Sequence, residues 1–134
     1  MAFEPLAAAA AIPAGPGTQS IPISKIRKVT ARRLAEAGVR ARVVSMPCRE
    51  WFDAQEQSYR DSVLPPIVKA RVSVEAGVAQ GWREVVGDHG RIVSLDHFGG
   101  SADYATLYRE FGITAEAVVL AAEDSIRAVA AAQA

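Results

Sequence analysis

The sequence contains few of the residue types on which disulfide, metal and membrane chemistry depend. Cys48 is the only cysteine among 134 residues, which excludes an internal disulfide and suits a reducing cytoplasm. Two histidines without a second cysteine do not form a metal-ligand set. No stretch approaches the roughly 18–20 apolar residues that cross a bilayer. The Ala-rich start lacks the basic region of a signal peptide. We therefore expect a cytoplasmic chain with no membrane partner.

Positive charge is concentrated in the first third of the chain. Up to Arg42 there are seven basic and two acidic side chains, a net charge of +5, so the rest carries −5 within a total of zero. One face of a predicted helix gathers Lys25, Lys28, Arg32 and Arg33. No aromatic side chain lies between them to stack on bases. A solvated helix face is therefore favoured over a nucleic-acid or membrane-surface patch.

The chain divides into a tail and one domain. Residues 1–20 are mostly Ala, Pro and Gly and have no apolar period to bury, which predicts a disordered tail. Residues 21–134 then form the predicted domain. Its first helix has Ser24 as a candidate N-cap and Gly38 as the residue that ends it.

From residue 41 onward, strand and helix patterns alternate. Strands are predicted at 41–46, 68–75 and 91–95. Between the first two lies a predicted helix in which Trp51, Gln55, Tyr59 and Val63 recur every four residues. Ser101 and Thr114 are predicted to cap two later helices, and the inner stripe expected for the last one is Val119, Ala122, Ile126 and Val129. The order predicts an α/β domain, a three-layer α/β/α arrangement with a mostly parallel sheet.

Four linked motifs carry a family resemblance. They are ARVVSMPCREWFDAQ (41–55), ARVSVEAGVAQGW (70–82), GRIVSLDHFGGSA (90–102) and LYREFGITAEAVV (107–119). In this order and spacing they closely resemble the C-terminal domain of transketolase, over about residues 30–126. The resemblance implies a domain that supports the enzyme, since in that family thiamine diphosphate, its divalent metal and the substrate lie between the two preceding domains. We expect this chain to bind no cofactor by itself and to contain no catalytic residue.

The resemblance also shows what is missing. The family's edge strand and its central strand, with the Gly-Ser-Glu type turn that follows, have no counterpart here. What precedes the match, residues 21–36, resembles the linker and the beginning of the catalytic domain in the acyltransferase subunit of 2-oxoacid dehydrogenase complexes. Neither His89 nor His97 stands in the catalytic His…Asp context of those subunits.

The remaining chemical candidates are few. The best is the loop after the last predicted strand, with Asp96, His97, Gly99, Gly100 and Ser101 as weak ligand candidates. Open α/β sheets bind ligands at the carboxyl ends of their strands, and a helix N-terminus can hold an anion. The alternative for this loop is a tight turn.

Two histidines and the cysteine have structural interpretations that outweigh functional ones. His97 is expected to cap or pack, and His89 to be exposed in its Gly-Asp-His-Gly loop. Cys48 precedes a helix, where its thiol pKa could fall, but a buried structural role is favoured because no base is evident nearby.

Three functions stay open at this point. The first is a non-catalytic transketolase-type C-terminal module with a structural or assembly role. The second is a fragment of an active thiamine-dependent transferase, which moves two-carbon ketol units between sugar phosphates in the pentose phosphate pathway and needs partner domains. The third is an acyltransferase-like or basic-helix binding protein. The expected partners are a second copy of the chain or transketolase-type N-terminal domains.

The missing central strand generates the first testable prediction. In the family that strand lies between the ones matching 41–46 and 68–75, so its loss would leave a gap of about 10 Å, two strand spacings. Residues 20–24 could insert, the two strands could pair directly, or a second molecule could donate a strand. We favour insertion. The segment 20–24 is too short to pair along the full length of the strand at 68–75, so marginal stability and self-association are expected. A monomer that unfolds cooperatively above about 60 °C, by calorimetry, would contradict this.

Overall fold

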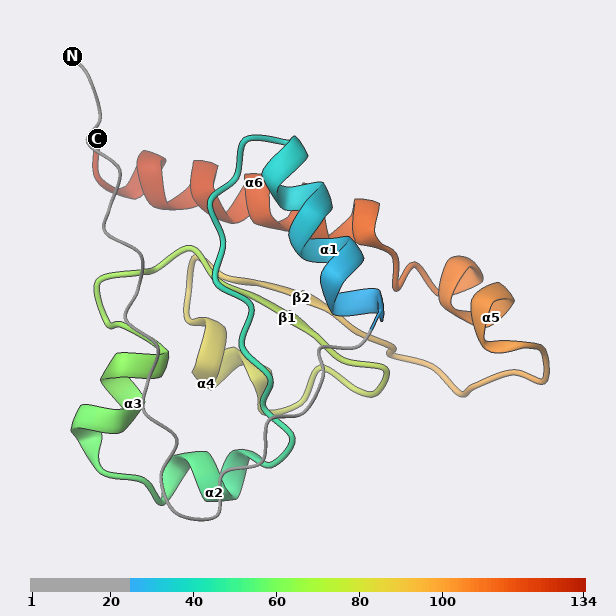
Figure 1. Ribbon diagram of the computed structural model, residues 1–134, viewed down its shortest axis with the longest axis horizontal. Helices are drawn as coiled ribbons and strands as arrows, with labels where there is room; N and C mark the ends of the chain where they lie inside the picture. Colours follow the sequence, from blue (N-terminus) through green and yellow to red (C-terminus); the bar gives the residue numbers. More distant parts are fainter. Residues whose placement is uncertain (1–24) are drawn as a thin grey trace.

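The computed structural model describes residues 25–134 of the chain, and Figure 1 shows how their elements are arranged. The helices are α1 (Lys25–Glu36), α2 (Arg49–Asp53), α3 (Gln57–Val63), α4 (Trp82–Val86), α5 (Tyr104–Glu110) and α6 (Ala115–Ala132), and the strands are β1 (Val72–Val74) and β2 (Arg91–Val93). The predicted α/β class is confirmed at this level, as helices alternating with parallel strands. The predicted tail at residues 1–20 and the proposed insertion of residues 20–24 lie outside the described part.

Two short parallel strands form the sheet of the described region. Val72 pairs with Arg91 and Val74 with Val93, and the Leu95 N–H still reaches the Gly77 carbonyl at 2.8 Å beyond the strand ends. The expected parallel direction is therefore confirmed, although both strands are shorter than predicted. In the sequence, α4 lies between the two strands. Both α4 and α6 contact both strands.

The strand predicted at 41–46 does not form in the described region. This segment is extended but enters no ladder. Arg42 attaches this segment to the end of α3, because its guanidinium donates to the carbonyls of Ser62 (2.7 Å) and Val63 (3.3 Å). A strand is stabilised by pairing. Without a neighbour in residues 25–134, the apolar pattern alone does not make one here.

Helix α6 is the longest element and begins as predicted. The Thr114 hydroxyl accepts a hydrogen bond from the Ala117 N–H at 3.1 Å, and Glu116 lies in the first turn, where a carboxylate opposes the positive end of the helix dipole. The predicted inner stripe was wrong by about one residue. Val118 and Ser125 are buried, whereas Ile126 is exposed. A serine on the buried face broke the apolar pattern.

The buried hydroxyl of Ser125 connects three parts of the molecule. Its side chain is wholly inaccessible to solvent. The oxygen accepts from the Arg71 backbone N–H at 3.2 Å, and the hydroxyl donates to the His89 carbonyl at 2.8 Å. One residue earlier, Asp124 forms an ion pair with Arg91. Helix α6 is thus attached to the start of both strands by polar contacts.

The side chain of Arg71 forms a second set of connections. Its guanidinium donates to four backbone carbonyls, those of Leu64 (3.2 Å), Pro65 (3.0 Å), Val68 (2.9 Å) and Val85 (2.8 Å). Leu64 caps the C-terminus of α3 and Val85 lies in the last turn of α4. These are helix-end carbonyls that have no intrahelical donor. One side chain therefore joins α3, α4 and the approach to β1.

Helix α1 packs against α6 and ends where the sequence predicts. Leu34 is buried in this contact region. Gly38 has a φ of 74°, and the Val39 N–H bonds to the Leu34 carbonyl at 2.8 Å, which is the geometry of a glycine-terminated helix. The described part of the segment that resembles an acyltransferase, residues 25–36, is thus a helix packed against α6.

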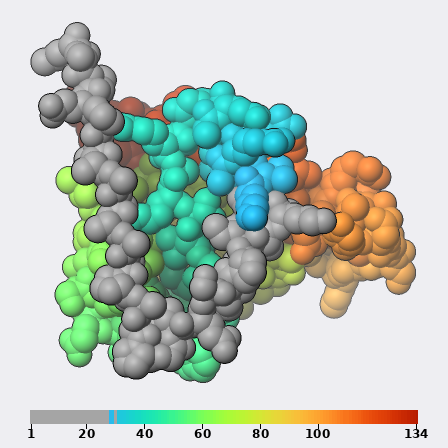
Figure 2. All heavy atoms as spheres, viewed as in Figure 1, coloured from blue at the N-terminus to red at the C-terminus, as the bar shows by residue number. Residues whose placement is uncertain are grey.

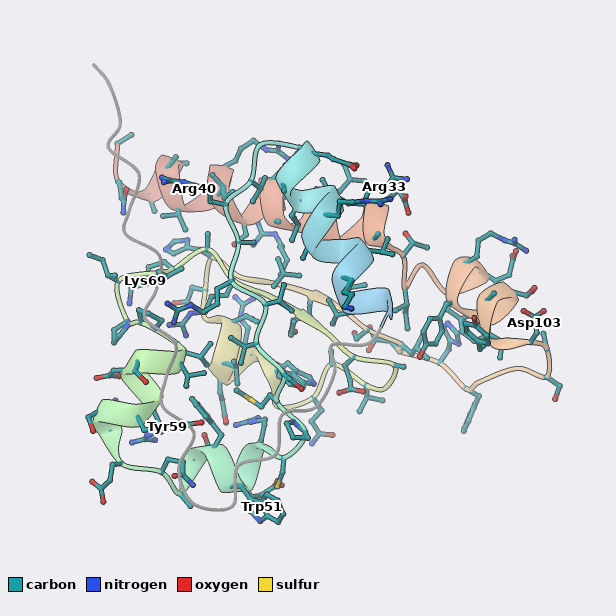
Figure 3. All side chains as sticks on the ribbon, in the orientation of Figure 1. Arg33, Arg40, Trp51, Tyr59, Lys69 and Asp103 are labelled. Carbon is teal, nitrogen blue, oxygen red and sulfur yellow. The ribbon has the colours of Figure 1, made fainter. Side chains whose placement is uncertain are left out.

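The helix predicted through Trp51 and Val63 is two helices instead of one. Helix α2 ends at Asp53 and α3 begins at Gln57, so the four-residue spacing does not place the aromatics on one continuous face. Trp51 is 76% exposed and points away from the body in Figure 3. Tyr59 is also exposed, and its ring lies 6.4 Å from that of Phe52. The expected amphipathic stripe is largely on the surface.

The apolar core of the described region is small. Its buried hydrophobic side chains are Leu34, Val86, Ile113 and Val118. Glycine helps α4 and β2 to approach, because a Cβ on Gly90 would lie 2.4 Å from the Val86 Cβ. With so few buried side chains, polar contacts such as those of Ser125 carry a large share of the structural specificity.

We expect Ser125→Ala to destabilise the domain by about 1–3 kcal/mol, because it leaves the Arg71 N–H without its acceptor and removes one of the two donors to the His89 carbonyl. Urea unfolding followed by circular dichroism measures the change. The matched control is Ser62→Ala, which removes an exposed hydroxyl bonded only to the Tyr59 carbonyl. Equal stability of the two variants would contradict the role assigned to Ser125.

Candidate functional site

The loop singled out by the sequence leaves the end of β2 and leads to α5. Loop and helix project beyond the rest of the molecule, at the right of Figures 1 and 2. The candidates Asp96, His97, Gly99, Gly100 and Ser101 are all exposed. Next to them Phe98 is 98% exposed. The structure therefore places the five candidates in one loop but does not enclose them.

The N-terminus of α5 is capped by Asp103, not by Ser101 as predicted. The Asp103 Oδ1 accepts from the backbone N–H groups of Ala105 and Thr106, both at 3.1 Å. The hydrogen bonds from Thr106, then that from Ala105, lower the pKa of this carboxyl. A carboxylate of the chain itself thus occupies the donors that the predicted anion would need. The missed signal is the spacing: Asp103 directly precedes the first residue of the helix, where a cap belongs.

The two histidines differ in how they are held. His97 packs edge-on against Phe111 with ring centroids 4.6 Å apart, and its Nδ1 lies 2.7 Å from the Phe98 carbonyl oxygen. The packing prediction for His97 is confirmed. His89 is half-buried rather than exposed, because its carbonyl accepts from Ser125 and from Arg91. Neither ring faces a carboxylate or nucleophile that would make it a general base.

Cys48 is half-buried, so the predicted burial was too strong. It occupies the N-cap position of α2 without capping it through its side chain. The thiol lies 3.3 Å from Glu50 Oε2 and donates to it. The pKa of Glu50 is lowered first by its own backbone N–H and then by this thiol. The contact gives the thiol an acceptor but no base that would activate it.

A polar hollow of about 470 Å³ lies among α2, α3 and α4. Its charged lining consists of Arg49, Asp53, Arg60, Asp61, Lys69, Arg71 and Glu84. These residues are spread over 36 positions of the sequence, and no local motif links them. The sequence therefore gave no signal for this hollow, which exists only because three short helices meet.

Most charges in the hollow are already engaged. Arg49 donates to Glu84 at 2.7 Å and to the Gly81 carbonyl at 2.5 Å, and the hydrogen bond to Glu84 raises the arginine pKa. Arg60 donates to Gln57 at 2.6 Å, while Arg71 holds the four carbonyls described above. The arrangement joins helices electrostatically. It brings no nucleophile and base together.

Within residues 25–134, no helix has the length and apolarity to cross a membrane. In the same part of the chain, no three His, Cys, Asp or Glu side chains gather where they could hold a metal ion.

Known proteins are similar to this chain in sequence and in fold. The family model for the transketolase-like TK C-terminal domain matches residues 25–114. Transketolase of Mycobacterium tuberculosis is 63% identical over 93 residues, which are 69% of this chain and 13% of that protein. For Mycobacterium leprae transketolase the values are 66% over 90 residues, 67% and 13%. The solved transketolase of Leishmania mexicana superimposes with a TM-score of 0.67 at 44% identity, over 76% of this chain and 15% of that one.

These matches define a C-terminal α/β module of a transketolase-like protein. The chain belongs to the transketolase-like TK C-terminal domain family. It spans about 13% of the length of the curated relatives it matches. The resemblance inferred from the four motifs is therefore confirmed, and the family match begins at residue 25, slightly before the expected start.

Replacing Asp103 by Ala should increase hydrogen exchange of the α5 amides, since Ala105 and Thr106 lose their cap. The pKa of Asp103 is lowered on folding, so its contribution is present above the usual value of 3.8 and is lost as the pH falls through the lower folded value. Ser101→Ala is the matched control and should leave exchange unchanged. NMR exchange rates that respond to Ser101 instead of Asp103 would contradict the assignment.

Proposed function

We propose that this chain is a non-catalytic C-terminal module with a structural or assembly role in a transketolase-like protein. The observation that carries the proposal is the extent of the match. It covers two thirds of the chain but only 13% of the mycobacterial relatives, and it lies within the family's C-terminal domain. A segment of that kind supplies a folded surface rather than a complete active centre.

The chemistry of the described residues supports the same proposal. The arginines that line the hollow hold helix ends and carboxylates, and Asp103 occupies the donors at the start of α5. The sequence offers neither a diphosphate-binding loop nor a set of oxygen ligands for a divalent metal. On this proposal thiamine diphosphate and its metal are bound by other domains, as in the full-length family, and not by this chain alone.

A second candidate function is a working part of a divided transferase. The identity of 63–66% over 90–93 residues is more than the few buried positions of the described residues could account for. A partner chain that supplies the thiamine-binding domains would then complete an enzyme for two-carbon ketol transfer in the pentose phosphate pathway. Genes for those domains beside this one would favour this candidate.

The proposal extends to architecture and location. Helices α4 and α6 both contact the two strands, which supports a three-layer α/β/α arrangement with the sheet in the middle. The single cysteine and its free thiol support a reducing compartment, and we place the protein in the cytoplasm. One curated relative, the potato transketolase at 52% identity, is named as chloroplastic.

The purified chain of 134 residues should neither bind thiamine diphosphate with Mg²⁺ nor transfer ketol units between sugar phosphates. Isothermal titration calorimetry and a coupled transketolase assay measure the two properties. Full-length Mycobacterium tuberculosis transketolase is the positive control. Calorimetric binding at micromolar affinity would overturn the proposal.

Complementation separates the two candidates. The chain is mixed with a transketolase truncated before its C-terminal domain, and ketol transfer is measured. No gain over the truncated enzyme alone supports a separate module. Activity that appears only in the mixture, and saturates with added chain, would replace the first candidate by the divided transferase.

A further inference from the structure

Strand β1 has an open hydrogen-bonding edge. Backbone groups of successive strand residues point to opposite sides. The Arg71 carbonyl and the Glu75 N–H bond to β2, to Arg91 and Val93 respectively. The N–H and C=O groups of Val72 and Val74 therefore point away from β2. Within residues 25–134 no backbone hydrogen bond engages them on that side.

This edge carries few of the features that protect exposed strands. Natural edges use proline, an outward lysine, a bulge or a covering segment to prevent pairing with other chains. The residues whose backbone groups point toward the open edge are small and apolar: Ala70, Val72, Val74 and Ala76. Val74 is 47% exposed, and Ala76 is exposed as well. The edge is thus exposed at Val74 and Ala76, and Val72 is half-buried.

The sequence of the edge is complementary to itself when read in the opposite direction. Residues 70–76 are ARVSVEA. An antiparallel copy centred on Ser73 sets Val72 opposite Val74, Arg71 opposite Glu75 and Ala70 opposite Ala76. The outward-pointing backbone groups then face each other. Val72 of one copy and Val74 of the other exchange two N–H···O=C hydrogen bonds, as a hydrogen-bonded antiparallel pair requires. A register shifted by one residue would place the outward-pointing N–H and C=O groups of one copy opposite residues whose backbone groups point toward their own β2.

Charge favours the same register. Glu75 of one copy lies across from Arg71 of the other, and opposite charges on facing strand positions attract. The Arg71 guanidinium bonds to neutral carbonyls, so its positive charge is not cancelled by those contacts. Glu75 forms no ion pair within the described residues. The two-fold axis makes this attraction occur twice.

We infer that the chain forms a two-fold symmetric dimer by antiparallel pairing of β1 edges, with Ser73 on the axis. The two small sheets then join into one sheet of four strands in the order β2, β1, β1, β2. This partner, a second copy of the chain, goes beyond the proposed function and does not depend on it. The closing experiments therefore fail or succeed independently of ketol-transfer measurements.

Amide hydrogen exchange of the whole chain, measured by NMR at micromolar and millimolar concentration, tests the inference directly. The Val72 and Val74 amides should become protected only at high concentration. The Glu75 amide, which bonds to Val93, should be protected at both. Protection of Val72 and Val74 that is independent of concentration would mean that another segment of the same chain occupies the edge, and fast exchange at both concentrations would mean that nothing does. Either result overturns the inference.

Variants test the surface by light scattering after size exclusion. Val74→Lys places a charge on the exposed edge position and should weaken dimerisation by about tenfold or more. Val74→Thr, which keeps a β-branched side chain, should dimerise as the natural chain does. Val78→Lys is the matched control, since Val78 is 60% exposed but lies beyond the strand. A dimer that Val74→Lys leaves intact, or that Val78→Lys weakens equally, would overturn the assignment of the edge.

Discussion

The guanidinium of Arg71 is the group on which the arrangement of the domain depends most. A two-stranded sheet is too small to be stable by itself, and it needs elements packed against it. Arg71 provides donors to carbonyls at the end of α3, in the approach to β1 and in the last turn of α4. Its own backbone N–H continues to Ser125 on α6. Three helices are therefore positioned relative to one strand through a single residue, in a region where only four hydrophobic side chains are buried.

Local signals in the sequence predicted the elements that are stabilised locally. Thr114 caps α6, Gly38 ends α1, and the β-branched residues around Val72 and Ile92 form strands. These features depend on backbone conformation and on neighbours within a few positions. Patterns of that kind can be read from one sequence, and the α/β class follows from their order.

Features that depend on distant partners could not be predicted in this way. Residues 41–46 have the composition of a strand, but a strand needs a neighbour to pair with. Ser125 has no apolar character, and it became the centre of the buried stripe because two backbone groups from other segments required a partner. The charged hollow was invisible in the sequence for the same reason, since its residues come from three helices. For α5 the sequence predicted the wrong cap, because Ser101 and Asp103 are both good caps and only the helix start decides between them.

Membership of the transketolase-like TK C-terminal domain family accounts for the order of strand and helix patterns along the chain. In the described residues, polar side chains are used to hold helix ends and strands together. Arg49, Arg71 and Asp124 are the main examples, and each has its partner in another element. Large apolar side chains such as Trp51 and Phe98 are exposed on the surface around this internal framework.

The projecting loop before α5 has a consequence for how the polypeptide could be divided. Residues 96–103 are exposed throughout, so a protease has access to the backbone there before any other part of the sheet opens. A cut between Gly99 and Gly100 would separate α6 covalently from both strands. The two pieces would still be linked by Ser125 and by the Asp124–Arg91 ion pair, together with the burial of Val118. The contacts that join α6 to the strands therefore lie on either side of the part of the chain most open to cleavage.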